Sequence, residues 1–296
     1  MLPCFIIGAG TMTVDFVENG ALLSGDIIYP EVVFDCGQCF RFYPAENGYT
    51  GVAHGKVINV SRKDGGLFIY PCNKDDFNKI WRRYFDFNLS YTELEECFAK
   101  DEILSKTIDS SRGMRLLIQD PFETIISFII SANNNIGRIR KIIEKICMLS
   151  GDKVFFENNV YYKFPSPEQL SILTLDQLTQ CGAGYRAPYI KETSKAIADG
   201  FDLDCVYEME YKEAKKYLLQ LKGIGPKVAD CILLFAFNKK NAFPVDVWIR
   251  RVLNNMYGFD PKNTNEAENF AIEHFGEYAG IAQQYLFNYA RLNKII

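Results

Sequence analysis

The stretch Tyr217-Leu-Leu-Gln-Leu-Lys-Gly-Ile-Gly-Pro-Lys-Val-Ala-Asp-Cys-Ile-Leu-Leu-Phe235 has two apolar segments separated by Gly223-Ile224-Gly225. Glycine often ends a helix and proline often begins one, so two helices joined by a tight turn are predicted, the second starting at Pro226. In such a turn Ile224 fills the groove between the helices, while the bare N–H groups at the second helix can bind a phosphate. An ordinary pair of helices has the same pattern, so the turn alone does not decide its function.

A second motif follows and changes that interpretation. In Asn241-Ala-Phe-Pro-Val-Asp-Val-Trp248, Pro244 and Val245 precede Asp246, which stands at the start of a predicted helix over residues 247–257. By itself such an aspartate is usually a helix N-cap. The pairing of helix–Gly-Ile-Gly–helix with Pro-Val-Asp resembles the helix-hairpin-helix signature of the DNA glycosylase superfamily that includes endonuclease III. This resemblance makes Lys227 a candidate nucleophile.

Further blocks along the chain resemble one branch of that superfamily, the 8-oxoguanine DNA glycosylase family. They occur in the family's order and cover most of the chain, at residues 36–42, 113–124, 131–139, 184–187, 223–231, 244–247 and 278–287. The resemblance implies a bifunctional enzyme that flips oxidised guanine out of double-stranded DNA. It would cleave the N-glycosidic bond through a lysine Schiff base and nick the abasic site by β-elimination. Base flipping is expected because C1′ cannot be reached inside the stack.

The family's pattern assigns the catalytic positions to Lys227 and Asp246. Lys227 would attack C1′, which requires a neutral amine, so we expect its pKa to be lowered by burial or by positive potential. Asp246 would cap its helix and offset the positive charge that develops on the sugar.

The same pattern assigns the base pocket. The carbonyl of Gly37 would accept the N7–H that 8-oxoguanine has and guanine lacks. Gln283 would read the Watson–Crick edge of the base, and Cys231 and Phe287 would sandwich its two faces. Cys231 lies four residues after Lys227, one helical turn along the same face, so both can line one pocket.

The remaining assignments concern contacts with DNA. Asn133, Arg138, Tyr185 and Arg186 match residues that fill the gap and contact the orphaned cytosine. Gly223, Gly225 and Val228 belong to the hairpin that would bind the phosphate backbone. Trp248 is also placed in this set, although it stands where animal members of the family have a histidine.

The fold class predicted is α+β. Residues 1–100 are expected to form an antiparallel sheet subdomain, with short strand-like segments at 21–24, 26–29, 32–34, 39–43, 51–53, 56–60 and 67–70. Residues 101–296 are expected to form an all-helical body that contains the hairpin and the Pro-Val-Asp turn. Helices are predicted from Pro121 and over residues 136–149, and capping boxes at Ser166 and Thr174.

Composition limits the remaining possibilities. The chain has 296 residues, 33 basic and 37 acidic side chains, and a net charge of −4, which excludes a general polycation but not a local basic face. Nine scattered cysteines do not indicate a disulfide framework. No apolar run approaches the roughly 20 residues of a membrane span, and the apolar start has no basic region, so neither a membrane span nor a signal peptide is expected. The protein is expected to be a monomer in a reducing cytoplasm, near the nucleoid if the source is a prokaryote.

Several alternatives remain open from the sequence. Cys36-x-x-Cys39 could suggest zinc or redox chemistry, but no second pair lies near it, so neither a metal nor a cofactor is expected. The last cysteine is Cys231, which excludes an iron–sulfur loop after Asp246. A glycosylase of the same fold for another damaged base, or a non-catalytic DNA-binding protein, are the alternative functions. Lys227 argues against the other glycosylases, which generally lack the hairpin lysine, and its presence together with Asp246 argues against a non-catalytic protein.

Overall fold

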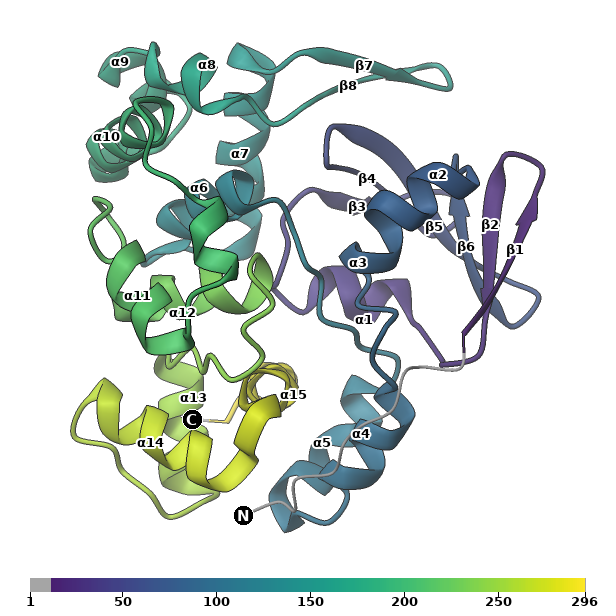
Figure 1. Ribbon diagram of the computed structural model, residues 1–296, viewed down its shortest axis with the longest axis vertical. Helices are drawn as coiled ribbons and strands as arrows, with labels where there is room; N and C mark the ends of the chain where they lie inside the picture. The colour runs from purple at the N-terminus through teal and green to yellow at the C-terminus, as the bar shows by residue number, and fades with distance from the viewer. Residues whose placement is uncertain (1–11, 296) are drawn as a thin grey trace.

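The computed structural model describes residues 12–295. An antiparallel sheet with few helices forms one side of the molecule and a mostly helical body forms the other (Figure 1). The predicted α+β class is confirmed. The apolar start at residues 1–8, for which no signal peptide was expected, lies outside the described residues.

Six strands form the sheet in the order β1-β2-β6-β5-β4-β3, and every neighbouring pair is antiparallel. Short hairpin turns fix the register. In the turn after β5, Asp64 and Gly65 both have positive φ, the conformation that a two-residue turn between twisted strands requires. The strands are β1 (Thr13–Val17), β2 (Gly20–Ser24), β3 (Phe42–Pro44), β4 (Tyr49–Ala53), β5 (Lys56–Lys63) and β6 (Gly66–Tyr70).

Residues 32–34, expected to be strand, are instead part of the helix α1 (Pro30–Asp35). Pro30 occupies the first helical turn, where a proline needs no N–H partner, and this signal outweighs the β-branched pair that follows it. The helix packs Phe34 onto Phe42 of the sheet, with ring centroids 4.0 Å apart. Residues 26–29 form no strand, and only Phe42–Pro44 of the region around 39–43 does.

The helices of the body begin where their capping residues predict. Asp120 caps the helix that starts at Pro121, and both expected capping boxes, at Ser166 and Thr174, are present. The helix predicted over 136–149 is observed as α7. The α-helices after the sheet are α2 (Lys74–Asp76), α3 (Arg82–Tyr84), α4 (Tyr91–Phe98), α5 (Glu102–Ser111), α6 (Pro121–Ser131), α7 (Ile136–Ser150), α8 (Pro167–Ser171), α9 (Leu175–Gln180), α10 (Ala187–Ala198), α11 (Tyr211–Leu218), α12 (Pro226–Phe235), α13 (Val247–Asn255), α14 (Thr264–Phe275) and α15 (Ala279–Leu292). A π-helical segment (Phe77–Trp81) and three 3-10 segments (Gly184–Arg186, Asp204–Tyr207, Gly276–Tyr278) complete the set.

The body is not entirely helical, which corrects one expectation. A hairpin of β7 (Lys153–Phe156) and β8 (Asn159–Tyr162) leaves the end of α7 and extends across to the sheet (Figure 1). Its aromatic and β-branched residues flank a turn at Glu157, which has positive φ. That pattern is typical of a hairpin and was missed because the surrounding segments are helical. Phe156 contacts Tyr70 of the sheet, with ring centroids 5.9 Å apart.

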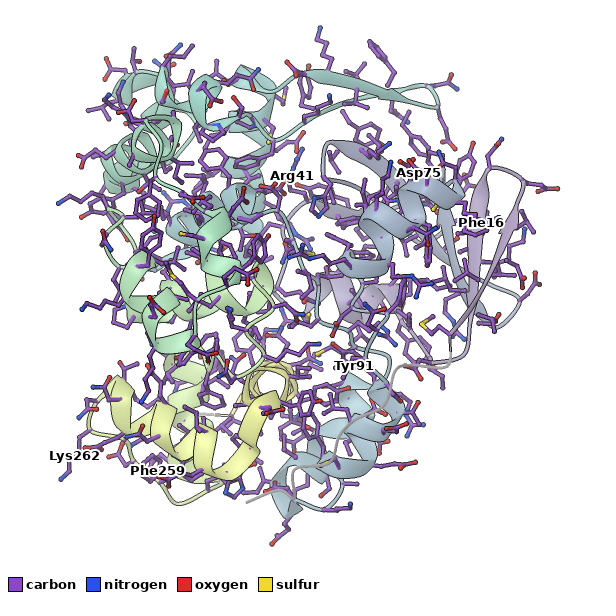
Figure 2. The ribbon with its side chains drawn as sticks, in the orientation of Figure 1. Phe16, Arg41, Asp75, Tyr91, Phe259 and Lys262 are labelled. Carbon is purple, nitrogen blue, oxygen red and sulfur yellow. The ribbon has the colours of Figure 1, made fainter. Side chains whose placement is uncertain are left out.

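Two hydrophobic cores meet along a seam between the sheet and the body. Arg41 lies at this seam (Figure 2), where its buried side chain donates to the carbonyl of Tyr162 and lies 3.7 Å from Glu123. Burial raises the pKa of Glu123 to about 7. The division of the chain near residue 100 stays a prediction.

Candidate active site and nucleic-acid interface

The hairpin between α11 and α12 has the local geometry expected from its sequence. Gly223 has φ +79°, and a Cβ there would lie 2.7 Å from Tyr189, so only glycine fits. Ile224 is buried between the helices. Gly225 is the N-cap of α12 and offers no side chain to the free N–H groups of the first turn.

Gly225 differs from Gly223 in a way that bears on function. Its φ is −96°, and a Cβ at this position would meet no heavy atom within 4 Å. The fold therefore does not demand glycine here. Close approach of an external group to the N-terminus of α12 would explain it, and that end of a helix attracts anions.

One pocket brings together both catalytic candidates and all four base-pocket candidates. Lys227, Asp246, Gly37, Cys231, Gln283 and Phe287 all line it, although they come from four separate parts of the chain. Its volume is about 40 Å³, which is room for a few water molecules but not for a purine. Insertion of a base therefore requires this pocket to widen.

Lys227 lies in the first turn of α12, with its amine 5.5 Å from the ring centre of Phe128. Burial favours the neutral amine, but neighbouring Cys231 and Asp246 favour the ammonium and outweigh it, so the pKa of Lys227 is raised. The expectation of a lowered pKa is wrong for this state of the protein. Burial acts in the expected direction, but the combined effect of the groups that face Lys227 is larger.

Asp246 caps α13, and its carboxylate accepts the N–H of Ile249 at 2.9 Å. Pro244, also in the pocket lining, fixes the extended backbone before it. Among the described residues that line the pocket, Asp246 alone carries a carboxylate. It therefore has two roles available, as a helix cap and as the negative group facing Lys227.

The base-pocket candidates form a narrow slot. Gly37 has φ +86°, and a Cβ on it would lie 3.4 Å from Phe287, so the glycine loop and the aromatic ring are in close proximity. Burial raises the pKa of the Cys231 thiol to about 11, so it is uncharged at neutral pH. Gln283 is buried, and its Oε1 has no hydrogen-bond partner among the described residues. A buried amide oxygen without a partner is costly, which points to a ligand that donates to it.

Three of the expected DNA contacts lie together beside the end of α6. Tyr185 is 58% exposed and donates to the carbonyl of Ala132 at 3.2 Å. Arg186 is buried, and its guanidinium donates to the carbonyls of Ala132 and Asn133. In this structure Arg186 supports the turn at Asn133 rather than projecting from the surface. Asn133 itself is exposed and has φ +50°.

The other expected DNA contacts are distributed over nearby first turns. Arg138 is exposed in the first turn of α7. Val228 is buried and Trp248 is partly exposed, with the guanidinium of Arg251 5.4 Å from its ring centre. Trp248 thus has an aromatic face already paired with a cation.

Sequence reasoning missed part of the pocket lining. Phe128, Phe235, Pro244 and Gln284 also line the pocket, and the rings of Phe128 and Phe235 stack with centroids 5.4 Å apart. The two phenylalanines lie in apolar helix segments, so nothing in the sequence distinguishes them from ordinary core residues. For Gln284, the only available signal was its position next to Gln283.

A buried ionic cluster supports α12 behind the pocket. Asp230 is fully buried, accepts the hydroxyl of Tyr211 at 2.8 Å and pairs with Lys215 at 2.8 Å. Lys215 also pairs with Glu268, so two carboxylates share one amine. Burial raises the pKa of Asp230 to about 7. This cluster fixes the helix that carries Lys227 and Cys231.

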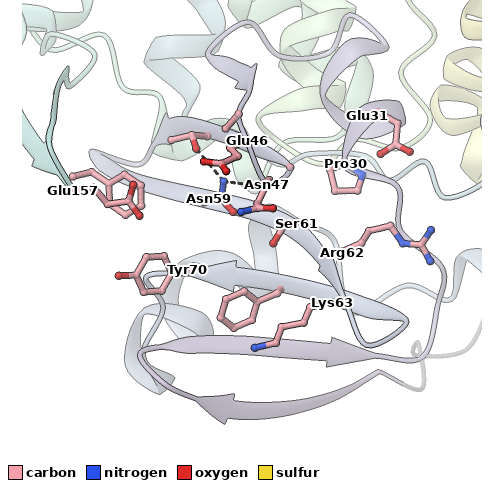
Figure 3. Close-up of a pocket in the computed structure, with 15 residues that line it drawn as sticks. Pro30, Glu31, Glu46, Asn47, Asn59, Ser61, Arg62, Lys63, Tyr70 and Glu157 are labelled. Atoms are coloured by element: carbon pink, nitrogen blue, oxygen red, sulfur yellow. Dashed lines mark hydrogen bonds between the residues drawn. The ribbon is translucent and has the colours of Figure 1, made fainter.

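A much larger hollow of about 810 Å³ lies over β5 and β6, on the sheet (Figure 3). Its lining includes Glu46, Arg62, Lys63, Tyr70 and Glu157. None of the residues singled out from the sequence lines it. The small pocket, where six of them converge, is therefore the better candidate for the active site.

No group of three or more histidine, cysteine, aspartate or glutamate side chains within residues 12–295 is placed to hold a metal ion. Cys36 and Cys39 are buried thiols that donate to backbone carbonyls. Within the same range, no helix is both long and apolar enough to cross a membrane.

Comparison with known proteins gives a consistent picture. Residues 26–125 match the family model "8-oxoguanine DNA glycosylase, N-terminal domain", and residues 126–277 match "HhH-GPD superfamily base excision DNA repair protein". A probable N-glycosylase/DNA lyase of Methanothermobacter thermautotrophicus is 43% identical over 243 residues, covering 75% of this chain and 76% of that protein. An N-glycosylase/DNA lyase of Arabidopsis thaliana is 35% identical over 280 residues, covering 86% and 75%.

Solved structures agree with the sequence relatives. The structure of Clostridium acetobutylicum 8-oxoguanine glycosylase/lyase, in complex with double-stranded DNA containing cytosine opposite 8-oxoG, matches with a TM-score of 0.92 and 38% identity. That match covers 96% of this chain and 99% of the Clostridium chain. The likeness therefore extends over both the sheet and the helical body.

Proposed function

Because this chain belongs to the 8-oxoguanine DNA glycosylase family of the HhH-GPD superfamily, we propose that its small pocket is the site where oxidised guanine is excised from DNA. The protein is a bifunctional DNA glycosylase and DNA lyase that acts on double-stranded DNA containing 8-oxoguanine. The observation that carries the site assignment is the convergence of Lys227, Asp246, Gly37, Cys231, Gln283 and Phe287 on one pocket.

The geometry supports a role for each pocket residue. The flipped base would lie between Cys231 and Phe287, with the Gly37 carbonyl accepting its N7–H. The unpaired Oε1 of buried Gln283 would accept an N–H from the Watson–Crick edge, which removes the cost of leaving that oxygen without a partner. Lys227 would attack C1′ as the base departs, forming the Schiff base from which β-elimination nicks the strand.

The charge state of Lys227 places a condition on this chemistry. Because its pKa is raised, the resting amine carries a proton that must pass to solvent or to a base before attack. Asp246 is the carboxylate in the pocket lining, so we assign it the stabilisation of positive charge near C1′. Asp246 is partly buried, and a carboxylate facing a developing cation is more effective once bound DNA excludes water from it.

The DNA backbone would be held outside the pocket. The N-terminus of α12, left open at Gly225, would bind a phosphate of the damaged strand, with Gly223 and Val228 shaping the same hairpin. Asn133, Tyr185 and Arg138 would enter the space left by the flipped base and contact the opposite strand, with Arg186 supporting them. Trp248 would lie beside the backbone near Asp246.

The protein is proposed to act as a monomer in a reducing cytoplasm, close to the nucleoid if the cell is prokaryotic. All eight cysteines within the described residues are free thiols, which supports a reducing compartment.

Borohydride trapping on a duplex with 8-oxoguanine opposite cytosine tests the assignment of the nucleophile. Wild-type protein should form a covalent complex, and Lys227→Gln should abolish it while binding of the lesion duplex persists. Lys222→Gln is a matched control, because Lys222 lies directly before the turn at Gly223–Gly225 and is exposed. Trapping of normal yield by Lys227→Gln would remove this lysine from the mechanism.

A further inference from the structure

The loop that carries Gly37 is held by side chains that bind its backbone carbonyls one after another. Arg140 donates to the carbonyl of Phe34 at 3.1 Å, and Arg291 donates to that of Asp35 at 2.6 Å. Gln284 donates to the carbonyl of Cys36 at 3.0 Å. Beyond the glycine, Gln119 donates to the carbonyl of Gln38 at 2.8 Å.

Gly37 interrupts this series. No hydrogen bond from a described residue to its carbonyl is found, although the carbonyls on both sides of it are occupied. Gln38 is fixed further by its own side chain, which donates to the carbonyl of Arg115 at 2.7 Å and accepts the N–H of Leu117 at 2.8 Å. The peptide between Gly37 and Gln38 is thus flanked by two peptides that cannot rotate freely.

Gln284 is the part of this arrangement that connects the loop to the base pocket. It is 3% exposed, lines the pocket and follows Gln283 directly in α15. Phe287 and Arg291 lie three and seven residues further along, which places all three on one face of the helix. One helix face therefore carries the ring beside Gly37 and two of the donors that hold the Gly37 loop.

We propose that Gln284 is a specificity-determining positioning residue, which fixes the Cys36–Gly37 peptide so that the Gly37 carbonyl alone remains available to the base. This inference rests on the proposed function of the pocket. 8-Oxoguanine differs from guanine at N7 by a single N–H, so discrimination depends on one acceptor at a defined place. With φ at +86°, Gly37 has no side chain to limit its backbone, and the neighbouring anchors must do so.

The chemistry of the variant follows from this contact. Gln284→Met keeps a long unbranched side chain of similar size but removes the donor, so the Cys36 carbonyl is released while packing is largely kept. Gln284→Glu places an acceptor against that carbonyl and should be worse than Met. A role in packing alone predicts the opposite order, because glutamate has nearly the shape of glutamine.

The experiment compares two reactions of the full chain. Single-turnover excision from an 8-oxoguanine:cytosine duplex requires base recognition, whereas nicking of a duplex with a preformed abasic site does not. For Gln284→Met we expect excision to slow on the order of tenfold, the effect of losing one well-placed hydrogen bond, while abasic-site nicking stays within about twofold. Gln180→Met, on an exposed position at the end of α9, is the matched control and should change neither reaction.

Binding measures the same effect without chemistry. In a Lys227→Gln background, the preference for the 8-oxoguanine duplex over the guanine duplex should fall about tenfold on adding Gln284→Met. Equal losses of rate on the lesion and abasic duplexes, or an unchanged binding preference for the 8-oxoguanine duplex, would overturn the proposal. Failure of wild-type protein to excise 8-oxoguanine would instead refute the proposed function, so the two failures are distinguishable.

Discussion

Asp246 offers a way to separate a structural role from a chemical one with a single atom change. Asp246→Asn retains an oxygen that can accept the Ile249 N–H, now made at 2.9 Å, because asparagine and aspartate are comparable N-caps. The variant loses the negative charge, whose interaction with the N-terminus of α13 is worth about 0.3–1 kcal/mol. We therefore expect a loss of unfolding free energy of at most about 1 kcal/mol, or at most about 2 °C in Tm for a chain of 296 residues.

The expected effect on catalysis is much larger. Removing a preorganised charge from beside a developing cation costs on the order of 10²- to 10³-fold in rate, the size seen when comparable electrostatic groups are deleted. Single-turnover excision from the lesion duplex measures this, and thermal unfolding measures the cap. Asp120→Asn is the control, because Asp120 caps α6 by accepting the Glu123 N–H at 2.9 Å but does not line the pocket. If Asp246→Asn slowed excision no more than Asp120→Asn does, the carboxylate would be a helix cap only.

Three further predictions concern backbone contact, pH and salt. Gly225→Ala should leave Tm unchanged within about 2 °C, because its Cβ meets no protein atom, but should weaken binding to any duplex; unchanged affinity would argue against close approach of a phosphate. Because the pKa of Asp230 is raised to about 7, the folded protein keeps a proton that the unfolded chain loses near pH 4. The contribution of Asp230 to stability should therefore fall as the pH rises from about 4 to about 7. Denaturant titrations at pH 5 and 7.5 measure it as the part of the change in unfolding free energy between the two pH values that Asp230→Asn removes. With two to four phosphate contacts, Lys227→Gln should bind lesion duplex with a log–log salt slope of roughly −2 to −4, and a slope near zero or steeper than about −7 would contradict this estimate.

Local signals in the sequence predicted much of the helical body correctly. Pro226, Asp120, Ser166 and Thr174 each fix a helix start by satisfying or avoiding free N–H groups, and these effects act within three or four residues. The same kind of signal was overlooked at Pro30, where a short helix replaces the strand expected over residues 32–34. Local patterns therefore predict secondary structure correctly only when helix-starting residues are considered together with the β-branched residues that favour strands.

The parts that sequence could not predict depend on distant contacts. Gln284 and Cys36 are 248 residues apart, and neither residue type indicates that one binds the backbone of the other. The raised pKa of Lys227 is a similar case, because it depends on which acidic groups the fold places nearest. The sequence resemblance predicted that Arg186 contacts DNA at the surface, yet the fold buries its side chain against the turn at Asn133. Such properties arise only when the segments assemble.

The narrowness of the empty pocket has a consequence for how the protein searches a genome. A slot of about 40 Å³ rejects every purine until it is widened, so free bases and nucleotides must supply the opening energy from their own few contacts. A base in a duplex is different, since protein contacts with the phosphates that flank it contribute binding energy before the base enters the pocket. Undamaged guanines vastly outnumber lesions, and a pocket too small at rest for a purine would let the protein pass them without committing to extrusion. On the proposed assignment, the small resting volume would be a first barrier to normal bases, ahead of the hydrogen bond that distinguishes the lesion.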